Sequence, residues 1–240
     1  MKRWEDLPES LRAPEVRPYY DALKKRRVAR FIKRAFDLFA SLFLLILFSP
    51  LFLILALAIK LDSRGPVFYR QTRITRYGKP FRIHKFRSMA VGADANGQVT
   101  VKDDPRVTRV GRVIRRLRLD EICQLIDVLE GKMTFVGTRP EVPEYVAAYT
   151  PKMTATLLMP AGVTGLASIR FKDEAELLGR GEDPDRIYRE EVLPAKMKYN
   201  LEELTRVGLG HDLKILCMTV LAAFGKDYGE TKTESDNAND

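Results

Sequence analysis

Apolar residues follow one another without a charge from Leu38 to Ile59, over 22 positions of the 240-residue chain. A transmembrane helix needs about 20 predominantly apolar residues, so this stretch is long enough to enter a bilayer. Ser49 and Pro50 stand at its middle. Because proline removes a backbone hydrogen bond and kinks a helix, the pattern predicts a break at this pair.

Cations flank the apolar run on both sides. Arg30, Lys33 and Arg34 precede it, and the downstream flank holds Lys60, Arg64, Arg70, Arg73 and Arg76. Since basic flanks are retained in the cytoplasm, a re-entrant helix that breaks at Pro50 and leaves by the same face satisfies both flanks. Each half would reach about 17 Å, about half the hydrocarbon thickness. A kinked single span stays open as the alternative.

The rest of the pattern predicts an α/β fold that is mixed and helix-rich, with a small sheet. Alternation from Pro66 to Phe86 predicts a hairpin that turns at Tyr77-Gly78-Lys79. The polar faces of its strands carry Arg70, Arg73, Arg82 and Lys85. Helical spacing is found in five segments: Glu15–Lys25 (amphipathic, on a surface), Thr108–Leu117, Leu119–Leu129 (ended by Gly131), Pro143–Ala148 and Leu213–Phe224.

Single residues within these segments carry further expectations. Asp37 lies one helical turn after Lys33 and Arg34 and is expected to pair with one of them. Cys123 and Cys217 lie in apolar helical patterns, which is typical of reduced core residues and not of a disulfide or metal site. In the segment Thr108–Leu117, the expected buried residues are Val110, Val113, Ile114 and Leu117.

Charge narrows the classes of function. The chain has 41 Lys+Arg against 32 Asp+Glu and a net charge of +9. This balance favours nucleic acid, phosphorylated small molecules or an anionic membrane as partners. The stacking aromatics and recognition-helix pattern of a nucleic-acid binder are missing, so we expect no nucleic-acid partner. The sequence also lacks a Walker P-loop, a GxGxxG after a strand, a GxSxG and an HExxH, which excludes the classes that depend on them.

Asp120 and Glu121 are adjacent carboxylates at the start of a predicted helix, directly after several arginines. In the first turn of a helix they would offset its dipole. The cations around them are denser than such a cap needs, which favours chemistry on a phosphate. A carboxylate can act as the nucleophile in that chemistry, and Mg²⁺ can neutralise a diphosphate. Both interpretations remain open for this pair.

A set of motifs in fixed order carries a family resemblance. The set is Lys33-Arg34 with Asp37, Ser49-Pro50, PVFYRQ, KFRSM, RLRLDEICQLIDVLEGKMTFVGTRPE and PAGVTGLA. Together these motifs resemble the bacterial sugar transferase family, the small monotopic phosphoglycosyl transferases, from about Lys33 to Ala167.

This resemblance implies a reaction and a place. Members move a sugar-1-phosphate from a UDP-sugar to undecaprenyl phosphate and release UMP, which starts the assembly of surface polysaccharides or glycoconjugates. They are compact domains held by a re-entrant helix in membrane lipid, on the cytoplasmic face of the bacterial inner membrane. By this resemblance the chain divides into an N-terminal surface helix and basic arm (1–30), the membrane helix (31–62), a catalytic domain (63–226) and a disordered tail (227–240).

The resemblance also implies roles for single residues. Asp120 would attack the β-phosphate and carry the phosphosugar, while Glu121 would assist, with Mg²⁺ as the metal held by the two carboxylates. Arg115 and Arg139 match arginines assigned to phosphate binding. Lys85 and Arg87 match a basic motif near the site, and we assign them to phosphate as well.

Four positions depart from the common pattern of the family, at Arg118, Cys123, Asp127 and Thr138. They leave every implied catalytic group in place but alter the surroundings of the nucleotide and sugar. The identity of the sugar, the glycan pathway and homo-oligomerisation stay open. So does a non-catalytic alternative, a membrane-anchored scaffold or regulator whose basic face binds anionic lipid.

Overall fold

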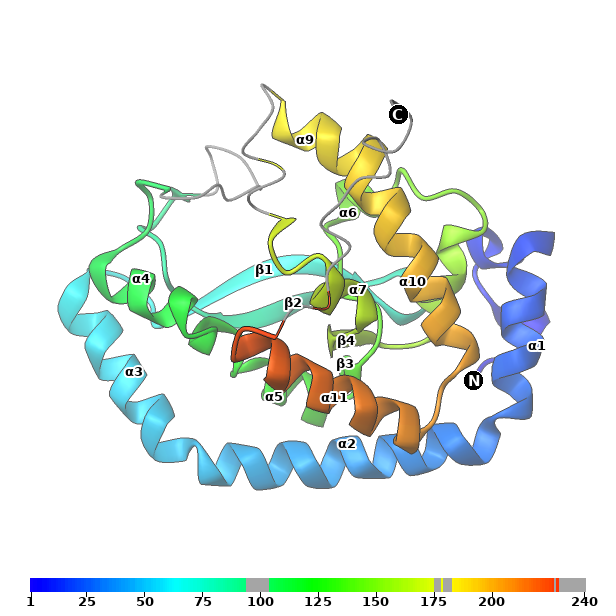
Figure 1. The fold of residues 1–240 in the computed structure, drawn as a ribbon, viewed down its shortest axis with the longest axis horizontal. Coiled ribbons are helices and arrows are strands. Elements are labelled where there is room, and N and C mark those ends of the chain that lie inside the picture. The colour runs from blue at the N-terminus through cyan, green and yellow to red at the C-terminus, as the bar shows by residue number, and fades with distance from the viewer. Residues whose placement is uncertain (94–103, 175–177, 179–182, 227, 229–240) are drawn as a thin grey trace, which may run out of the picture.

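A computed structural model describes residues 1–93, 104–174, 178, 183–226 and 228. Figure 1 shows a long helical arm, α2 and α3, that runs beneath and beside a domain with two small sheets at its centre. The fold is mixed and helix-rich, as the sequence predicts. The predicted tail falls on residues that are, apart from Tyr228, outside the described part.

The arm consists of α2 (Arg27–Leu47) and α3 (Ser49–Asp62), which meet at a bend of 60°. The break predicted at Ser49 and Pro50 is confirmed. Pro50 stands in the first turn of α3, where its missing N–H is not needed, and the Ser49 hydroxyl donates to the Ile46 carbonyl at 2.8 Å. In the described part of the chain, no single helix has the length and apolarity to cross a membrane, whereas this bent pair meets that test jointly.

Three charged residues near the start of α2 fasten the arm to the domain. Lys33 donates to the Val136 carbonyl at 3.0 Å and pairs with Asp212 on α11. Arg34 donates to the last carbonyls of α5, those of Val128 and Leu129.

Asp37, the third of these residues, accepts from the Thr134 hydroxyl at 2.6 Å and from the Phe135 N–H at 3.2 Å. The pairing expected between Asp37 and Lys33 or Arg34 is therefore wrong. The reason is that the partners of all three residues come from the domain and not from the neighbouring helical turn. Since Lys33 and Asp37 are both buried, each needs such a partner to offset its lost hydration.

Two separate two-stranded sheets form the centre of the fold. Strands β1 (Phe68–Thr75) and β2 (Lys79–Phe86) pair antiparallel as the predicted hairpin, whereas β3 (Met133–Val136) and β4 (Ala161–Thr164) pair in parallel. In the parallel pair, a Cβ on Gly162 would lie 2.3 Å from the backbone of Gly137, so the close approach of these segments requires glycine.

The hairpin register shows on which face of the hairpin each of the predicted cations lies. Arg70 lies opposite His84 and Thr72 lies opposite Arg82, so Arg70 and Arg82 share a face. Arg73 and Lys85 belong to the opposite face because neighbouring residues of a strand alternate sides. The cations of the hairpin are thus divided between its two faces, and a count of polar positions without the register could not show this.

Helices cover the sheets from several sides. Helix α1 (Arg17–Lys25) forms at the predicted place, and its Tyr20 and Leu23 pack with Leu11 against Leu158 of the domain. The remaining helices are α4 (Arg109–Arg116), α5 (Gln124–Leu129), α6 (Pro143–Val146), α7 (Leu166–Arg170), α9 (Pro184–Ile187), α10 (Leu193–Thr205) and α11 (Leu209–Ala223). Shorter helical turns cover Trp4–Asp6, Glu9–Leu11, Pro14–Val16, Arg76–Gly78, Leu119–Glu121, Met153–Leu158 and Tyr188–Val192.

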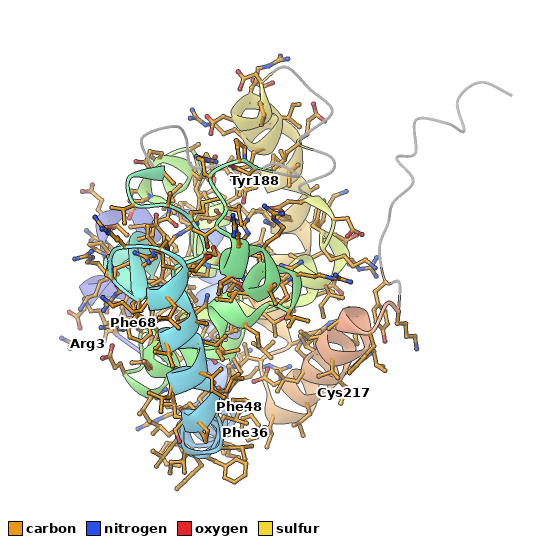
Figure 2. The ribbon with its side chains drawn as sticks, turned by 90° about the vertical axis from the view of Figure 1, so that its left-hand side faces the viewer. Arg3, Phe36, Phe48, Phe68, Tyr188 and Cys217 are labelled. Carbon is orange, nitrogen blue, oxygen red and sulfur yellow. The ribbon has the colours of Figure 1, made fainter. Side chains whose placement is uncertain are left out.

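Large apolar side chains stay exposed along the arm and on the helices beside it. Those of α2 and α3 include Phe31, Phe39, Phe43, Ile46, Leu53 and Leu57; α4 adds Val113, the residue after α4 adds Leu117, and α11 adds Val220 and Leu221. Figure 2 shows Phe36 and Phe48 at the lower edge of the molecule, at the opposite end from Tyr188. An apolar surface of this extent on a soluble monomer is unusual and marks an interaction face.

This exposed surface explains two incorrect predictions. Val113 and Leu117 are exposed although helical spacing predicts that they are buried, whereas Ile114 of the same helix is in the core. Cys123 is buried as expected, but Cys217 is exposed on α11 (Figure 2). Spacing identifies the apolar stripe of a helix but cannot tell whether protein or another apolar phase covers it.

Candidate active site

The segment between α4 and α5 carries the two adjacent carboxylates. Arg118 takes a left-handed conformation with φ of 56°, and a single 3₁₀ turn, Leu119–Glu121, follows it. Helix α5 begins only at Gln124, so the prediction that both carboxylates lie in its first turn is wrong. They stand instead on a tight turn whose backbone at Arg118 is uncommon for a residue other than glycine, and such strain often occurs at functional sites.

Glu121 is held by two cations that come from distant parts of the chain. Both carboxylate oxygens receive N–H groups of Arg139, one of them at 2.9 Å, and Lys85 donates to Oε1 at 3.1 Å. Burial alone would raise the pKa of Glu121, but the charges of Arg139 and Lys85 outweigh it and hold that pKa well below its ordinary value. Glu121 is therefore ionised, and its orientation is fixed by a two-point contact.

The pKa of Asp120 is shifted in the opposite direction from that of Glu121. Burial and the neighbouring charge of Glu121 raise the pKa of Asp120, and the charges of Lys85 and Arg115 only partly offset this. No salt bridge within 4.0 Å to Asp120 is found among the described residues. The two adjacent carboxylates thus differ. Glu121 is bound in ion pairs, whereas Asp120 is the more basic carboxylate and has no ion-pair partner within the described residues. Carboxylates whose environments separate their pKa values commonly have different chemical roles.

Asp120 borders a cavity of about 600 Å³, here named the hairpin cavity. Its basic and polar lining comes from both hairpin strands, from the segments after β2 and before α4, and from α4, and it includes Arg70, Gln71, Arg73, Arg82, Lys85, Arg87, Arg106 and Arg115. A cavity of this size accommodates a small molecule, and its arginines suit a ligand with several phosphate oxygens.

Glu121 and Arg139 border a second cavity of about 660 Å³, here named the arm cavity. Leu44 and Phe48 of the arm form part of its lining. Further lining comes from α11 with Thr219 and Ala222, and from the cations Arg116, Arg118 and Lys172. The carboxylate pair therefore lies between a polar cavity at the hairpin and a partly apolar cavity that reaches the exposed arm.

Of the predicted phosphate-binding residues, Lys85, Arg115 and Arg139 are gathered around the carboxylates. Lys85 and Arg139 contact Glu121 directly, and Arg115 shares the hairpin cavity with Asp120. Burial lowers the pKa of Lys85, and the negative charge of Glu121 counteracts this effect.

Arg87 lies near the site, as expected, and also makes contacts that the sequence did not indicate. It lines the hairpin cavity, but its guanidinium donates to the Ser63 carbonyl at 2.7 Å, to the Ser63 hydroxyl at 2.9 Å and to the Arg64 carbonyl at 2.9 Å. It caps the end of α3 and so ties the arm to the hairpin. A Cβ on Gly65 would lie 2.0 Å from Arg87 Nη1, which explains the glycine beside this contact.

Sequence reasoning missed Arg73 as a residue of the site. Its guanidinium donates to Gln71 Oε1 and, at 3.1 Å, to the carbonyl of Pro140. Because Pro140 follows Arg139, this bond supports the turn that delivers Arg139 to Glu121. The available signal was the alternation of the hairpin, which places Arg73 on the same face as Lys85.

A metal centre built by protein side chains alone is not found among the described residues, where no group of three or more His, Cys, Asp or Glu comes together. Asp120 provides carboxylate oxygens beside the hairpin cavity, and the carboxylate of the adjacent Glu121 is held by Arg139 and Lys85. This donor set fits Mg²⁺, which takes one or two protein carboxylates and leaves its other positions to water and substrate phosphates.

Comparison with known families decides the classification. Residues 28–226 match the model of the family described as bacterial sugar transferase. The chain belongs to this family. The resemblance seen in the sequence motifs is thereby confirmed. Asp120, Glu121 and Arg139 lie within the matched residues, and so does the bent arm from residue 28 onward.

Several curated relatives of this chain carry names that state a reaction. A "UDP-glucose:undecaprenyl-phosphate glucose-1-phosphate transferase" of Escherichia coli (strain K12) is 36% identical over 222 residues, which is 90% of this chain and 45% of the relative. A protein of the same name from Caulobacter vibrioides is 38% identical over 192 residues, 78% of this chain and 68% of the relative.

A further relative is named for another sugar. The "UDP-N-acetylgalactosamine-undecaprenyl-phosphate N-acetylgalactosaminephosphotransferase" of Aeromonas hydrophila is 41% identical over 143 residues, 58% of this chain and 34% of the relative. The chain thus spans less than half the length of the Escherichia and Aeromonas relatives. Because relatives at similar identity are named for glucose and for N-acetylgalactosamine, identity alone does not select a sugar.

The electrostatics of the pair predict opposite effects on stability. Asp120→Asn is expected to raise the melting temperature at pH 7 by a few degrees, since about 1 kcal/mol corresponds to about 2–4 °C in a domain of this size. The raised pKa means that ionised Asp120 destabilises the fold above that pKa. This penalty disappears as pH falls below the ordinary value of about 3.9, so the gain shrinks on acidification.

Glu121→Gln is the matched comparison and is expected to lower the melting temperature at pH 7. The lowered pKa means that ionised Glu121 stabilises the fold above its ordinary pKa, and this contribution is lost on acidification. Thermal unfolding in detergent at pH 7 and at about pH 3, which lies below the ordinary pKa of both carboxylates, measures both variants. An Asp120→Asn protein that melts below the wild type at pH 7 would contradict the assignment.

Proposed function

We propose that this chain transfers a sugar-1-phosphate from a UDP-sugar to undecaprenyl phosphate and releases UMP. The observation that carries the proposal is the carboxylate pair, in which Glu121 is bound by two cations while Asp120 faces the hairpin cavity. The names of the relatives supply the donor and acceptor classes, and the two cavities that meet at the pair offer room for both.

In the first step, a carboxylate oxygen of Asp120 attacks the β-phosphorus of the UDP-sugar. A bond forms between that oxygen and phosphorus, and the bond from phosphorus to the oxygen of UMP breaks, with the electron pair leaving on UMP. The raised pKa of Asp120 supports this role because a more basic carboxylate is a stronger nucleophile once it is deprotonated. The basic lining of the hairpin cavity, including Arg115, is suited to hold the diphosphate.

In the second step, a phosphate oxygen of undecaprenyl phosphate attacks the same phosphorus and returns the Asp120 carboxylate. The products are undecaprenyl-diphosphate-sugar and the free enzyme. The arm cavity suits the acceptor, since apolar residues such as Phe48 lie on one side and Arg116 and Arg118 on another. A lipid phosphate could reach the pair from that side while its chain stays against the exposed apolar arm.

Glu121 would act by position and charge. Its carboxylate holds Arg139 and Lys85 at the point where the two phosphates must meet. Both cations can then turn to the phosphate oxygens as negative charge accumulates there. When bound, Mg²⁺ would add a Lewis acid that neutralises the diphosphate and the leaving UMP, with Asp120 and Glu121 as its protein ligands.

We further propose that the arm enters the bilayer and returns to the cytoplasmic face. Support comes from the 60° bend, from the apolar side chains exposed on α2 and α3, and from the basic residues at both ends of the arm. The exposed Val113, Leu117 and Val220 would extend the bilayer contact to α4 and α11. This arrangement would put the arm cavity at the membrane surface.

A scaffold that binds anionic lipid is the competing function. It accounts for the net charge and for the apolar arm. It gives no reason for a carboxylate with a raised pKa beside a cavity lined with arginines, nor for the cations brought to Glu121 from separate segments.

UMP release separates the two functions. The purified protein in detergent with undecaprenyl phosphate and Mg²⁺ is expected to release UMP from at least one of UDP-glucose, UDP-galactose, UDP-N-acetylglucosamine and UDP-N-acetylgalactosamine. Asp120→Asn should lower the rate by about a thousandfold or more because it removes the nucleophile. Asp21→Asn, which removes an exposed carboxylate of α1, is the control and should retain full rate. Wild-type rates for Asp120→Asn would refute the covalent scheme, and no UMP from any donor would favour the scaffold.

The topology of the arm is tested by labelling. Cys217→Ser removes the exposed native thiol, and Lys25→Cys or Arg64→Cys then places a thiol before α2 or after α3. In oriented membrane vesicles, an impermeant maleimide is expected to reach both positions from the cytoplasmic face only. Labelling of the two positions from opposite faces would show a kinked single span and refute the re-entrant arrangement.

A further inference from the structure

A third cavity, of about 670 Å³, lies away from the carboxylate pair and is here named the N-terminal cavity. It is enclosed by the first residues of the chain, α1, the start of α2, the hairpin turn and the beginning of β3. In Figure 1 this region lies at the end of the molecule opposite α4. None of its lining residues lines the hairpin cavity or the arm cavity.

Cations dominate the lining of the N-terminal cavity. They come from four parts of the chain and are Lys2, Arg3, Arg17, Lys24, Arg27, Arg30, Lys33, Arg34 and Arg76. Two carboxylates face them: Asp37, which is bonded to Thr134 and Phe135, and Glu5, which is exposed. The cavity therefore carries a large excess of positive charge.

Some of these cations are satisfied by the fold and some are not. Lys33 pairs with Asp212, Arg34 donates to the carbonyls that end α5, and Arg3 and Arg17 each pair with an aspartate of their own segment. Among the described residues, no salt bridge within 4.0 Å is found for Lys24, Arg27, Arg30 or Arg76. Of these four, Arg76 donates its Nε–H to the Leu158 carbonyl at 3.2 Å and lies over the Tyr77 ring.

Arg30 is the clearest case of an unsatisfied cation. Its Nε is buried and lacks a hydrogen-bond partner within the described part of the protein. Burial lowers the pKa of Arg30, and the charges of Arg76 and Arg27 lower it further. A buried donor without an acceptor and a group of like charges each cost stability, so the protein alone gives no reason for this arrangement.

We propose that the N-terminal cavity binds a phosphate group through Arg27, Arg30 and Arg76, carried either by an anionic phospholipid or by a soluble phosphate compound. Arginine donors that converge without a carboxylate partner match the several acceptor oxygens of a phosphate. Phe31, which also lines the cavity, is 74% exposed and belongs to the apolar surface of the arm. The cavity thus lies where lipid headgroups would stand if the arm enters a bilayer.

Thermal stability tests this proposal independently of turnover. The full chain is studied in detergent with inorganic phosphate against chloride at equal ionic strength. It is also studied in nanodiscs of phosphatidylcholine with or without phosphatidylglycerol. We expect the melting temperature of the wild type to rise with one of these phosphate sources. A rise with phosphatidylglycerol alone identifies a headgroup site, and a rise with inorganic phosphate identifies a site open to soluble phosphate.

The variant that tests the site is Arg27→Gln/Arg30→Gln. Each cation near a phosphate surface contributes about fivefold to binding, so the apparent dissociation constant should rise about 25-fold. Without phosphate, the variant is expected to melt at or above the wild-type temperature because like charges are removed. Arg12→Gln/Lys25→Gln removes the same charge from exposed positions outside the cavity lining and should respond as the wild type does.

Three results would overturn the proposal. The first is a wild type that responds to neither phosphate source. The second is an equal response of the two double variants, which would show a general effect of net charge. The third is a loss of stability in phosphate-free Arg27→Gln/Arg30→Gln, which would show that these cations support the fold. The single variant Arg30→Gln repeats the melting-temperature measurement with one charge removed in place of two.

Discussion

The ion pairs of Glu121 with Arg139 and Lys85 are the interaction on which the site depends. They hold one carboxylate firmly ionised, and that fixed charge, together with burial, raises the pKa of the adjacent Asp120. They also join the hairpin, the turn after α4 and the Gly137-Thr138-Arg139 segment at one point. Removing either cation would leave the half-buried Glu121 carboxylate with one cationic partner in place of two. The proposed chemistry would therefore rely on contacts that also join parts of the fold.

A second set of polar contacts positions this site relative to the apolar arm. Lys33, Arg34 and Asp37 bind the first half of the arm to α11, α5 and β3, and Arg87 binds its far end to the hairpin. The bend at Ser49 is thereby held between two fixed ends. Because Leu44 and Phe48 line the cavity that reaches Glu121, the arm forms part of the site in addition to any role as an anchor.

The sequence was sufficient for several elements and for the family but not for their mutual arrangement. The break at Pro50 and the hairpin agree with what the pattern predicts, and Lys85, Arg115 and Arg139 lie near the carboxylates, as the family resemblance implies. The partners of Asp37 and the capping role of Arg87 were missed because they depend on contacts between segments far apart in the chain. The exposed Val113 and Leu117 were missed because spacing records apolarity without identifying what covers it.

The most direct test of the central claim, that Asp120 is the nucleophile, is the mass of its peptide after reaction. The protein is incubated with a UDP-sugar and Mg²⁺ without acceptor, quenched, digested and compared with Asp120→Asn treated in the same way. We predict that the peptide containing Asp120 gains the mass of one phosphosugar, that the variant peptide does not, and that undecaprenyl phosphate removes the adduct. An adduct on another residue, or release of UMP without any adduct on a peptide of the enzyme, would contradict the account.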